Sequence, residues 1–142
     1  MTTHTGIDLN WKALRLTYGL VAFLAGLDKF FHLLANWDQY LAPQVAALLP
    51  VSGAVFMRAV GVIEMAVGLL ILTAWTRIGA YIAAVWLLSI AVNLALTGAY
   101  YDVAVRDVAM AVGAWTLARL TEARQPEDSR SVAPAARAEA RS

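Results

Sequence analysis

The fold is decided by residues 53–75, which read GAVFMRAVGVIEMAVGLLILTAW. About 20 helical residues cross the ~30 Å hydrocarbon core of a bilayer, so this stretch is long enough to span it. Similar apolar stretches occupy residues 11–35, 77–97 and 101–120. Proline is absent from all of them, as expected of helices that must satisfy their own backbone hydrogen bonds in lipid. The sequence therefore predicts an all-α, polytopic membrane protein, built as an antiparallel four-transmembrane-helix bundle.

The composition supports this class and excludes several kinds of chemistry. Of the 142 residues, 61% are apolar and 15% are charged, whereas soluble domains have roughly 45–50% and about 25%. The formal net charge of +1 creates no field that would attract nucleic acid. The chain has no cysteine, which excludes disulfides, thiolate nucleophiles and cysteine-ligated clusters. With only two histidines, we expect no metal site and no covalently attached cofactor.

Positive residues in the short connections predict the orientation, because Lys and Arg remain on the cytoplasmic side. Lys12 and Arg15 lie at the start of the first stretch, Arg77 separates the second from the third, and Arg124 follows the fourth. Both termini are therefore predicted to be cytoplasmic. We expect residues 1–121 to form the transmembrane domain. Residues 122–142 hold few large apolar side chains and are expected to be a flexible cytoplasmic tail.

Two segments allow a second interpretation. The first stretch could be a cleavable signal peptide, although it exceeds the usual apolar core and no convincing small-x-small cleavage site follows it. Residues 36–52 connect the first two stretches on the outer face, where they could form a short surface helix or an ordered loop. Trp37 and Tyr40 are expected to anchor this connection at the interface.

Polar side chains within the apolar stretches identify the candidate site, since each ionisable one costs about 2.5–3.5 kcal/mol at the centre of a membrane helix. In the predicted topology most of them fall in the outer half of the bilayer, and Glu64 lies near its middle. Random placement would seldom gather the polar residues of four helices at one depth. The sequence therefore predicts a polar pocket that binds a small ligand or exchanges a proton, formed by Asp28, Lys29, His32, Arg58, Glu64, Asn93, Arg106 and Asp107.

The spacing around Glu64 indicates a close helix contact. At 100° per residue, Gly61, Glu64 and Gly68 share an arc of about 60°. The glutamate therefore emerges between two glycines that admit the backbone of another helix.

Structural roles compete with the pocket for several of these residues. Lys29 and Arg58 could extend to the outer head groups of the membrane. Asp102 could be the N-cap of the fourth helix. Arg106 and Asp107 could form an architectural ion pair, and these alternatives stay open at the level of sequence.

The chain also contains Gly26-Leu27-Asp28-Lys29 near the end of the first stretch, Gly61-Val62-Ile63-Glu64-Met65-Ala66-Val67-Gly68-Leu69-Leu70 on the second, and Arg106-Asp107 followed by Gly113 on the fourth. Together these motifs resemble the signatures of the DoxX-like family of small four-helix bacterial and archaeal membrane proteins, over roughly residues 12–120. A related branch, which includes a reactive-chlorine resistance protein, is similar through Leu41-Ala42-Pro43 and the helix of Glu64.

The resemblance implies a redox-linked role in a prokaryotic inner or plasma membrane. Some family members are associated with electron transfer from thiosulfate to quinone, and others with membrane complexes that detoxify oxidants together with soluble partners. Quinone is thus a candidate ligand, and a membrane-protein complex or a homo-oligomer is an expected partner besides the lipid bilayer. The chain has no thiol to receive sulfane sulfur, so a non-catalytic subunit is favoured over an autonomous thiosulfate-oxidising enzyme.

Two functions follow from these observations. In the first, the polar pocket holds a quinone head group or a small polar metabolite. In the second, the chain is a non-catalytic accessory subunit of a larger membrane complex, and the ion cluster keeps its helices in register. Transport through an oligomer ranks last, because four helices leave little room for alternating access and no inverted repeat is evident.

Overall fold

The computed structural model describes residues 2–124, and every regular element in that range is a helix. In chain order these are α1 (Thr2–Phe31), the short 3-10 helix η1 (Trp37–Tyr40), α2 (Pro43–Leu48), α3 (Gly53–Leu72), α4 (Thr76–Thr97) and α5 (Tyr101–Arg124). The prediction of an all-α fold is confirmed for this part of the chain. Residues 122–124 of the predicted tail continue α5, and the rest of the tail lies outside the described residues.

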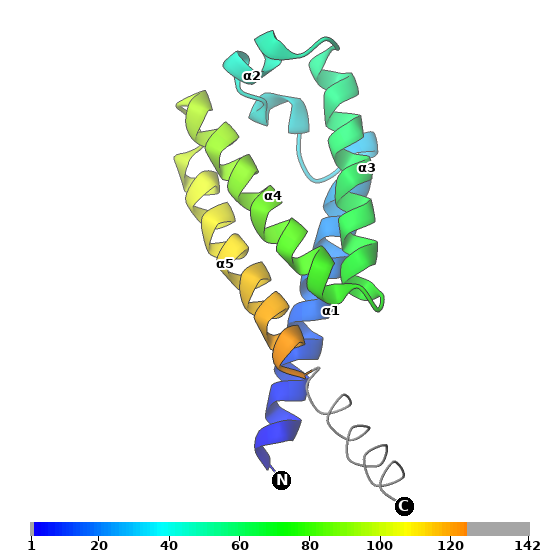
Figure 1. The fold of residues 1–142 in the computed structure, drawn as a ribbon. Helices are drawn as coiled ribbons and strands as arrows, with labels where there is room; N and C mark the ends of the chain where they lie inside the picture. The colour runs from blue at the N-terminus through cyan, green and yellow to red at the C-terminus, as the bar shows by residue number, and fades with distance from the viewer. Residues whose placement is uncertain (1, 125–142) are drawn as a thin grey trace, which may run out of the picture.

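The four long helices form two antiparallel pairs, with α1 along α3 and α4 along α5 (Figure 1). Figure 1 shows that the pairs converge where α3 turns into α4 and diverge toward the end that carries η1 and α2. Short connections enforce this antiparallel order, because only residues 73–75 separate α3 from α4 and only residues 98–100 separate α4 from α5.

Small side chains dominate the apolar core, which lets the helices approach one another closely. At the converging end the core consists of Val67, Ile71, Ala80, Ala83, Ala84, Ala114, Leu117 and Ala118. A smaller cluster toward the diverging end joins Ala91 and Leu94 of α4 to Ala104 of α5. Along α5, the buried carboxylate of Asp107 lies between these two apolar clusters.

Helix α1 is shifted from the predicted stretch of residues 11–35, because it begins at Thr2 and ends at Phe31. Its end has a local cause. His32 takes a left-handed φ of 56°, and the Asp28 carboxylate accepts hydrogen bonds from the backbone amides of Leu33 (2.8 Å) and Leu34 (3.0 Å). Side-chain bonds to nearby amides compete with helical hydrogen bonds, so the apolar residues after Phe31 do not continue the helix.

Helix α3 ends at Leu72, earlier than the predicted residue 75, because a side chain from another helix binds its last carbonyl groups. The Arg15 guanidinium of α1 donates to the carbonyl oxygens of Ile71 (3.0 Å), Leu72 (2.5 Å) and Thr73 (2.9 Å). The last carbonyl groups of a helix have no internal donors and need such partners. Of the other two helices, α4 begins at Thr76 rather than residue 77, and α5 extends to Arg124 rather than residue 120.

The connection between α1 and α3 contains the short helix that was one of its two predicted forms. Pro43 opens α2 at a position where the missing N–H costs no helical hydrogen bond. Asn93 of α4 holds the preceding segment by donating from Nδ2 to the Tyr40 carbonyl (2.6 Å) and accepting at Oδ1 from the Ala42 amide (3.0 Å). The ring of Tyr40 also packs edge-to-face on Tyr100, with 4.9 Å between centroids. The connection is thereby attached to α4.

Among the described helices, α3 and α4 are long and apolar enough to cross a membrane. Helices α1 and α5 are at least as long but contain more charged residues. The structure therefore contains two apolar helices of spanning length, each packed against a more polar one.

Candidate functional site

Lys29 of α1 and Glu64 of α3 form a buried ion pair, with 2.5 Å between Lys29 Nζ and Glu64 Oε2. The two side chains are only 5% and 10% exposed. Each charge alone would carry a large desolvation cost in such a place, which its partner offsets. The predicted pocket therefore contains one pair of charges that neutralise each other within the chain.

Glycines on both helices bring this pair into contact. A Cβ atom added at Gly61 would lie 2.6 Å from the carbonyl oxygen of Gly26, and one added at Gly26 would lie 2.5 Å from that of Gly61. The contact repeats two turns away, where a Cβ at Gly68 would lie 2.7 Å from the carbonyl oxygen of Gly19. The prediction that Gly61 and Gly68 admit another backbone is confirmed, and α1 is the helix that they admit.

Lys29 also faces an aromatic ring and a second carboxylate. Its Nζ lies 3.9 Å from the centroid of the Trp37 ring, within cation–π range. Asp107 of α5 is only 6% exposed, and the Lys29 charge acts on its carboxylate. The ion-pair partner of Asp107 is Arg106 Nε at 3.6 Å, beyond hydrogen-bond length, and the Arg106 side chain is 66% exposed. Asp107 is therefore a buried acid with weaker pairing than Glu64.

Asp28 is buried as well, but its partners are donors that follow α1 in the chain rather than a basic side chain. Besides the amides of Leu33 and Leu34, it accepts a hydrogen bond of 2.8 Å from Trp37 Nε1. This bond fixes the indole that faces Lys29. Asp28 therefore positions Trp37 at the site and has its own acceptor oxygens occupied.

Several predicted pocket residues lie apart from this interior. His32, Arg58 and Arg106 are exposed, and Asn93 is used in holding the connection between α1 and α3. Asp102, for which the role of N-cap was left open, lies inside the first turn of α5, because this helix begins one residue earlier. An acidic side chain there is still favoured by the positive end of the helix dipole.

Lys29, Glu64 and Asp107 are thus buried on three different helices, with Lys29 paired to Glu64 and close enough to Asp107 to act on its charge. An ammonium group donates hydrogen bonds and carboxylates accept them. Such a set can hold a small molecule that has both acceptor and donor groups. Within residues 2–124, no three histidine, aspartate or glutamate side chains gather as they would around a metal ion.

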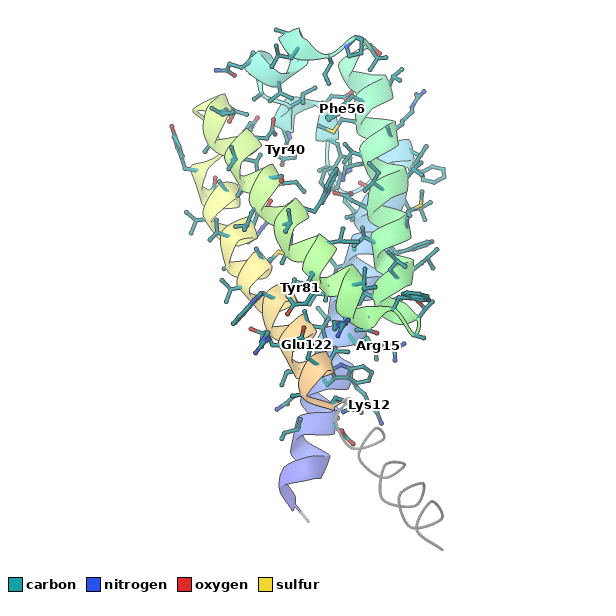
Figure 2. The ribbon with its side chains drawn as sticks, in the orientation of Figure 1. Lys12, Arg15, Tyr40, Phe56, Tyr81 and Glu122 are labelled. Carbon is teal, nitrogen blue, oxygen red and sulfur yellow. The ribbon has the colours of Figure 1, made fainter. Side chains whose placement is uncertain are left out.

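Sequence reasoning missed a polar network at the converging end of the bundle. Trp11 Nε1 donates to Thr121 Oγ1 at 2.8 Å, and the Tyr18 hydroxyl donates to the Met110 carbonyl at 2.7 Å. Figure 2 labels further members of this end, namely Lys12, Arg15, Tyr81 and Glu122. The partners in these bonds are far apart in the chain, so local spacing carries no signal for them. The glycine at 113, which leaves room for the Tyr18 ring, was the one local sign.

Comparison of the chain with protein-family models, with curated proteins and with solved structures finds no match. The DoxX-like resemblance therefore stays a prediction that depends on the motifs quoted above. The buried Lys29–Glu64 pair and the burial of Asp107 are independent of that resemblance, because they come from the packing of the helices.

Proposed function

We propose that the chain is an integral membrane protein whose four long helices cross the bilayer as an antiparallel bundle. Large apolar side chains exposed on every long helix support this proposal. Leu24 of α1 and Val62 of α3 are each 53% exposed, Val85 of α4 is 66% exposed, and Val105 of α5 is 70% exposed. Soluble proteins rarely expose extensive apolar surface, whereas lipid tails would cover it. The charged residues of α1 and α5 are compatible with lipid where they are buried and paired, as Lys29 is.

In the proposed orientation both termini lie on the cytoplasmic side of a prokaryotic inner or plasma membrane. Lys12, Arg15 and Arg124 lie at the end of the bundle where α1 begins and α5 ends. Positive residues favour the cytoplasmic side, so η1 and α2 would lie on the opposite side.

Because the chain lacks cysteine, single cysteines can test this topology without a background signal. The variants Gln44→Cys in α2 and Ala123→Cys at the end of α5 both carry the new thiol at an exposed position. A membrane-impermeant maleimide should label Gln44→Cys in intact cells, and Ala123→Cys only after the membrane is opened. Labelling of both positions in intact cells, or of neither, would contradict the proposed topology.

Within this bundle, the proposed role is that of a DoxX-like subunit of a redox-linked process, which binds a quinone or another small polar ligand and does no catalysis on its own. The observation that supports this role is the buried, weakly paired Asp107, whose carboxylate lies within electrostatic reach of the Lys29 charge. Lys29 could donate to a carbonyl oxygen of the ligand, and Asp107 could accept from a hydroxyl group. A quinone head group has such carbonyls, and its reduced form has such hydroxyls.

Thermal unfolding of the purified chain tests this ligand proposal, since a ligand that binds only the native state raises the Tm. Titration with a short-chain ubiquinone in mild detergent should raise the Tm of the wild type, but not that of Asp107→Asn. Asp102→Asn is the matched control, because Asp102 is an exposed aspartate on the same helix, and it should respond like the wild type.

Native mass spectrometry of the gently purified chain can detect bound polar ligands other than quinones. A bound small molecule that is lost from Asp107→Asn and retained by Asp102→Asn supports the proposal. An empty wild-type chain together with no quinone effect on the Tm would overturn it, as would equal quinone effects in all three proteins.

A second function, that of a non-catalytic accessory subunit, is favoured by the partners that Asp28, Glu64 and Asn93 find within the chain. Polar groups satisfied in this way need no ligand and would hold the helices in register. The exposed apolar faces would then pack on helices of a larger complex or of a second copy. Purification from native membranes distinguishes the two functions, because an accessory subunit should recover its partner in fixed ratio, and a Glu64→Gln variant should lose the partner.

A further inference from the structure

The converging end of the bundle has two adjoining surface cavities that the proposed function does not use. The first has a volume of about 230 Å³ and lies between α1, the turn from α3 to α4, and the end of α5. Its lining includes Trp11, Arg15, Thr73, Thr76 and Arg124. The second has a volume of about 320 Å³, shares Trp11 and Arg15, and adds Lys12, Leu16 and Leu72. Figure 2 shows Lys12 and Arg15 together at this end.

Hydrogen bonds hold the guanidinium of Arg15 in the wall of both cavities. Its Nε donates to the Ile71 carbonyl, and its Nη2 donates to the carbonyls of Leu72 and Thr73. Nη1 takes no part in these three bonds. The guanidinium is thus fixed by the end of α3 while one of its donor groups remains for another partner.

Trp11 is fixed in the same way by its hydrogen bond to Thr121. The guanidinium carbons of Arg15 and Arg124 lie 5.0 Å and 4.2 Å from the centroid of its ring. Two positive groups are therefore ordered around one aromatic ring before any ligand arrives.

The charges around the cavities favour a phosphate group. Lys12, Arg15 and Arg124 line them. Asp8 pairs with Arg124, and Glu122 at the same end pairs with Arg119. A positive excess therefore remains in the described part of this region. Guanidinium groups recognise phosphate oxygens through paired hydrogen bonds, and a lysine ammonium adds a mobile point charge.

We propose that the two cavities bind the phosphate of an anionic phospholipid in the cytoplasmic leaflet. Leu16 and Leu72 give the second cavity an apolar wall, which suits the glycerol and the first acyl carbons, whereas a free phosphate would have no use for it. Basic pockets between membrane helices on the cytoplasmic side bind acidic lipid head groups in other proteins, and tryptophan is typical of that depth. This inference rests on the proposed membrane insertion but is independent of the ligand proposed at Asp107.

Native mass spectrometry of the full-length chain in detergent, titrated with phosphatidylglycerol, tests the proposal. The wild type should retain phosphatidylglycerol and should not retain phosphatidylcholine. The double variant Lys12→Gln/Arg124→Gln should bind phosphatidylglycerol about tenfold more weakly, because it loses two charges near the head group. Arg15 is left unchanged in this variant, because it also donates hydrogen bonds to the last carbonyl groups of α3. Its loss could lower lipid binding by destabilising the fold.

Arg58→Gln is the matched control, because it removes an exposed arginine from a part of α3 far in the chain from the cavities. This control should bind phosphatidylglycerol like the wild type, and inorganic phosphate in excess should not displace the lipid. Unchanged lipid binding by the double variant, or equal retention of phosphatidylcholine, would overturn the proposal. Displacement by inorganic phosphate would instead assign the cavities to a soluble anion. A negative quinone titration leaves this result unaffected, so the two proposals fail separately.

Discussion

The α1–α3 pair and the α4–α5 pair are both antiparallel, but they achieve close packing with different residues. In the first, Gly26 and Gly61 let the two backbones touch beside a buried ion pair. In the second, alanines fill the contact, as where Ala104 packs on α4. Backbone contact shortens the distance between side chains that flank it, so charged groups can meet inside the first pair, whereas the alanine contact surrounds no such pair. The difference shows that small residues can either seal an apolar interface or create a polar one.

Among the variants that test the difference between the two helix pairs, removal of one charge of the buried ion pair should change the free energy of unfolding most. Glu64→Ala leaves the Lys29 ammonium buried without its partner, and losing half of a buried ion pair costs about 3–5 kcal/mol in the free energy of unfolding. The measurement is chemical unfolding in mixed detergent micelles. Arg119→Ala, which breaks the exposed Arg119–Glu122 pair of α5, is the control and should change the unfolding free energy little.

The same measurement on a double variant separates lost charge from lost packing. Lys29→Met combined with Glu64→Leu removes both charges and keeps apolar volume, and such replacements of buried pairs are often neutral or stabilising. We therefore expect recovery of most of the stability that Glu64→Ala loses. A Glu64→Ala effect as small as that of Arg119→Ala would mean that the ion pair does not hold α1 against α3.

The glycine contact should give the next largest effect. In Gly61→Ala the new methyl group would meet the Gly26 carbonyl, which is backbone and cannot rotate away, so the helices must separate at a cost of about 1–3 kcal/mol. Gly6→Ala is the same substitution on α1 with no described atom within 4 Å of the new carbon. It should keep or slightly raise stability, because alanine favours the helix. Equal effects of the two variants would exclude a special role for the contact.

The smallest change in the free energy of unfolding is expected for substitutions at the residue that follows the first helix of each pair. Both α1 and α4 are followed by a left-handed residue, which is His32 with φ 56° in one case and Gly98 with φ 72° in the other. A side chain costs roughly 1 kcal/mol in this conformation. His32→Gly should therefore raise the unfolding free energy by about 1 kcal/mol, and Gly98→Ala should lower it by a similar amount.

These two variants also test the predicted role of His32 in the pocket. A stabilised His32→Gly protein that still responds to quinone would agree with a residue that only ends a helix. A loss of the quinone effect on the Tm would instead show that the imidazole contributes to the proposed site.

Features of the site that depend on residues close together in the sequence could be predicted, whereas features that depend on distant residues could not. The position of Glu64 between Gly61 and Gly68 was predicted, because helical periodicity places these residues on one face. The exposure of Arg58 was one of the alternatives left open, and that of His32 was not predicted, because the sequence shows that a polar residue lies in an apolar stretch but not which way its side chain faces. Asn93 was assigned to the pocket for the same reason, while its partners Tyr40 and Ala42 belong to a segment distant in the chain.

The ends of the helices illustrate the same limit. Apolar residues continue beyond Phe31 and Leu72, so hydropathy extended both helices. The actual ends are set by Asp28, which captures the amides that follow α1, and by Arg15, which captures the carbonyls of α3 from another helix. The first cause is nearby in sequence and could have been considered, whereas the second requires the fold.

The sequence by itself determined that this chain forms long helices, and it determined which face of α3 would accept a neighbour, because hydrophobic pattern and glycine spacing act over a few turns. Only the tertiary structure decided that α1 is that neighbour and that Lys29 pairs with Glu64, while the adjacent Asp28 binds Trp37 instead. The physical reason is that a charge pair depends on the register and rotation of two helices to within about an ångström, and many distant contacts set these together.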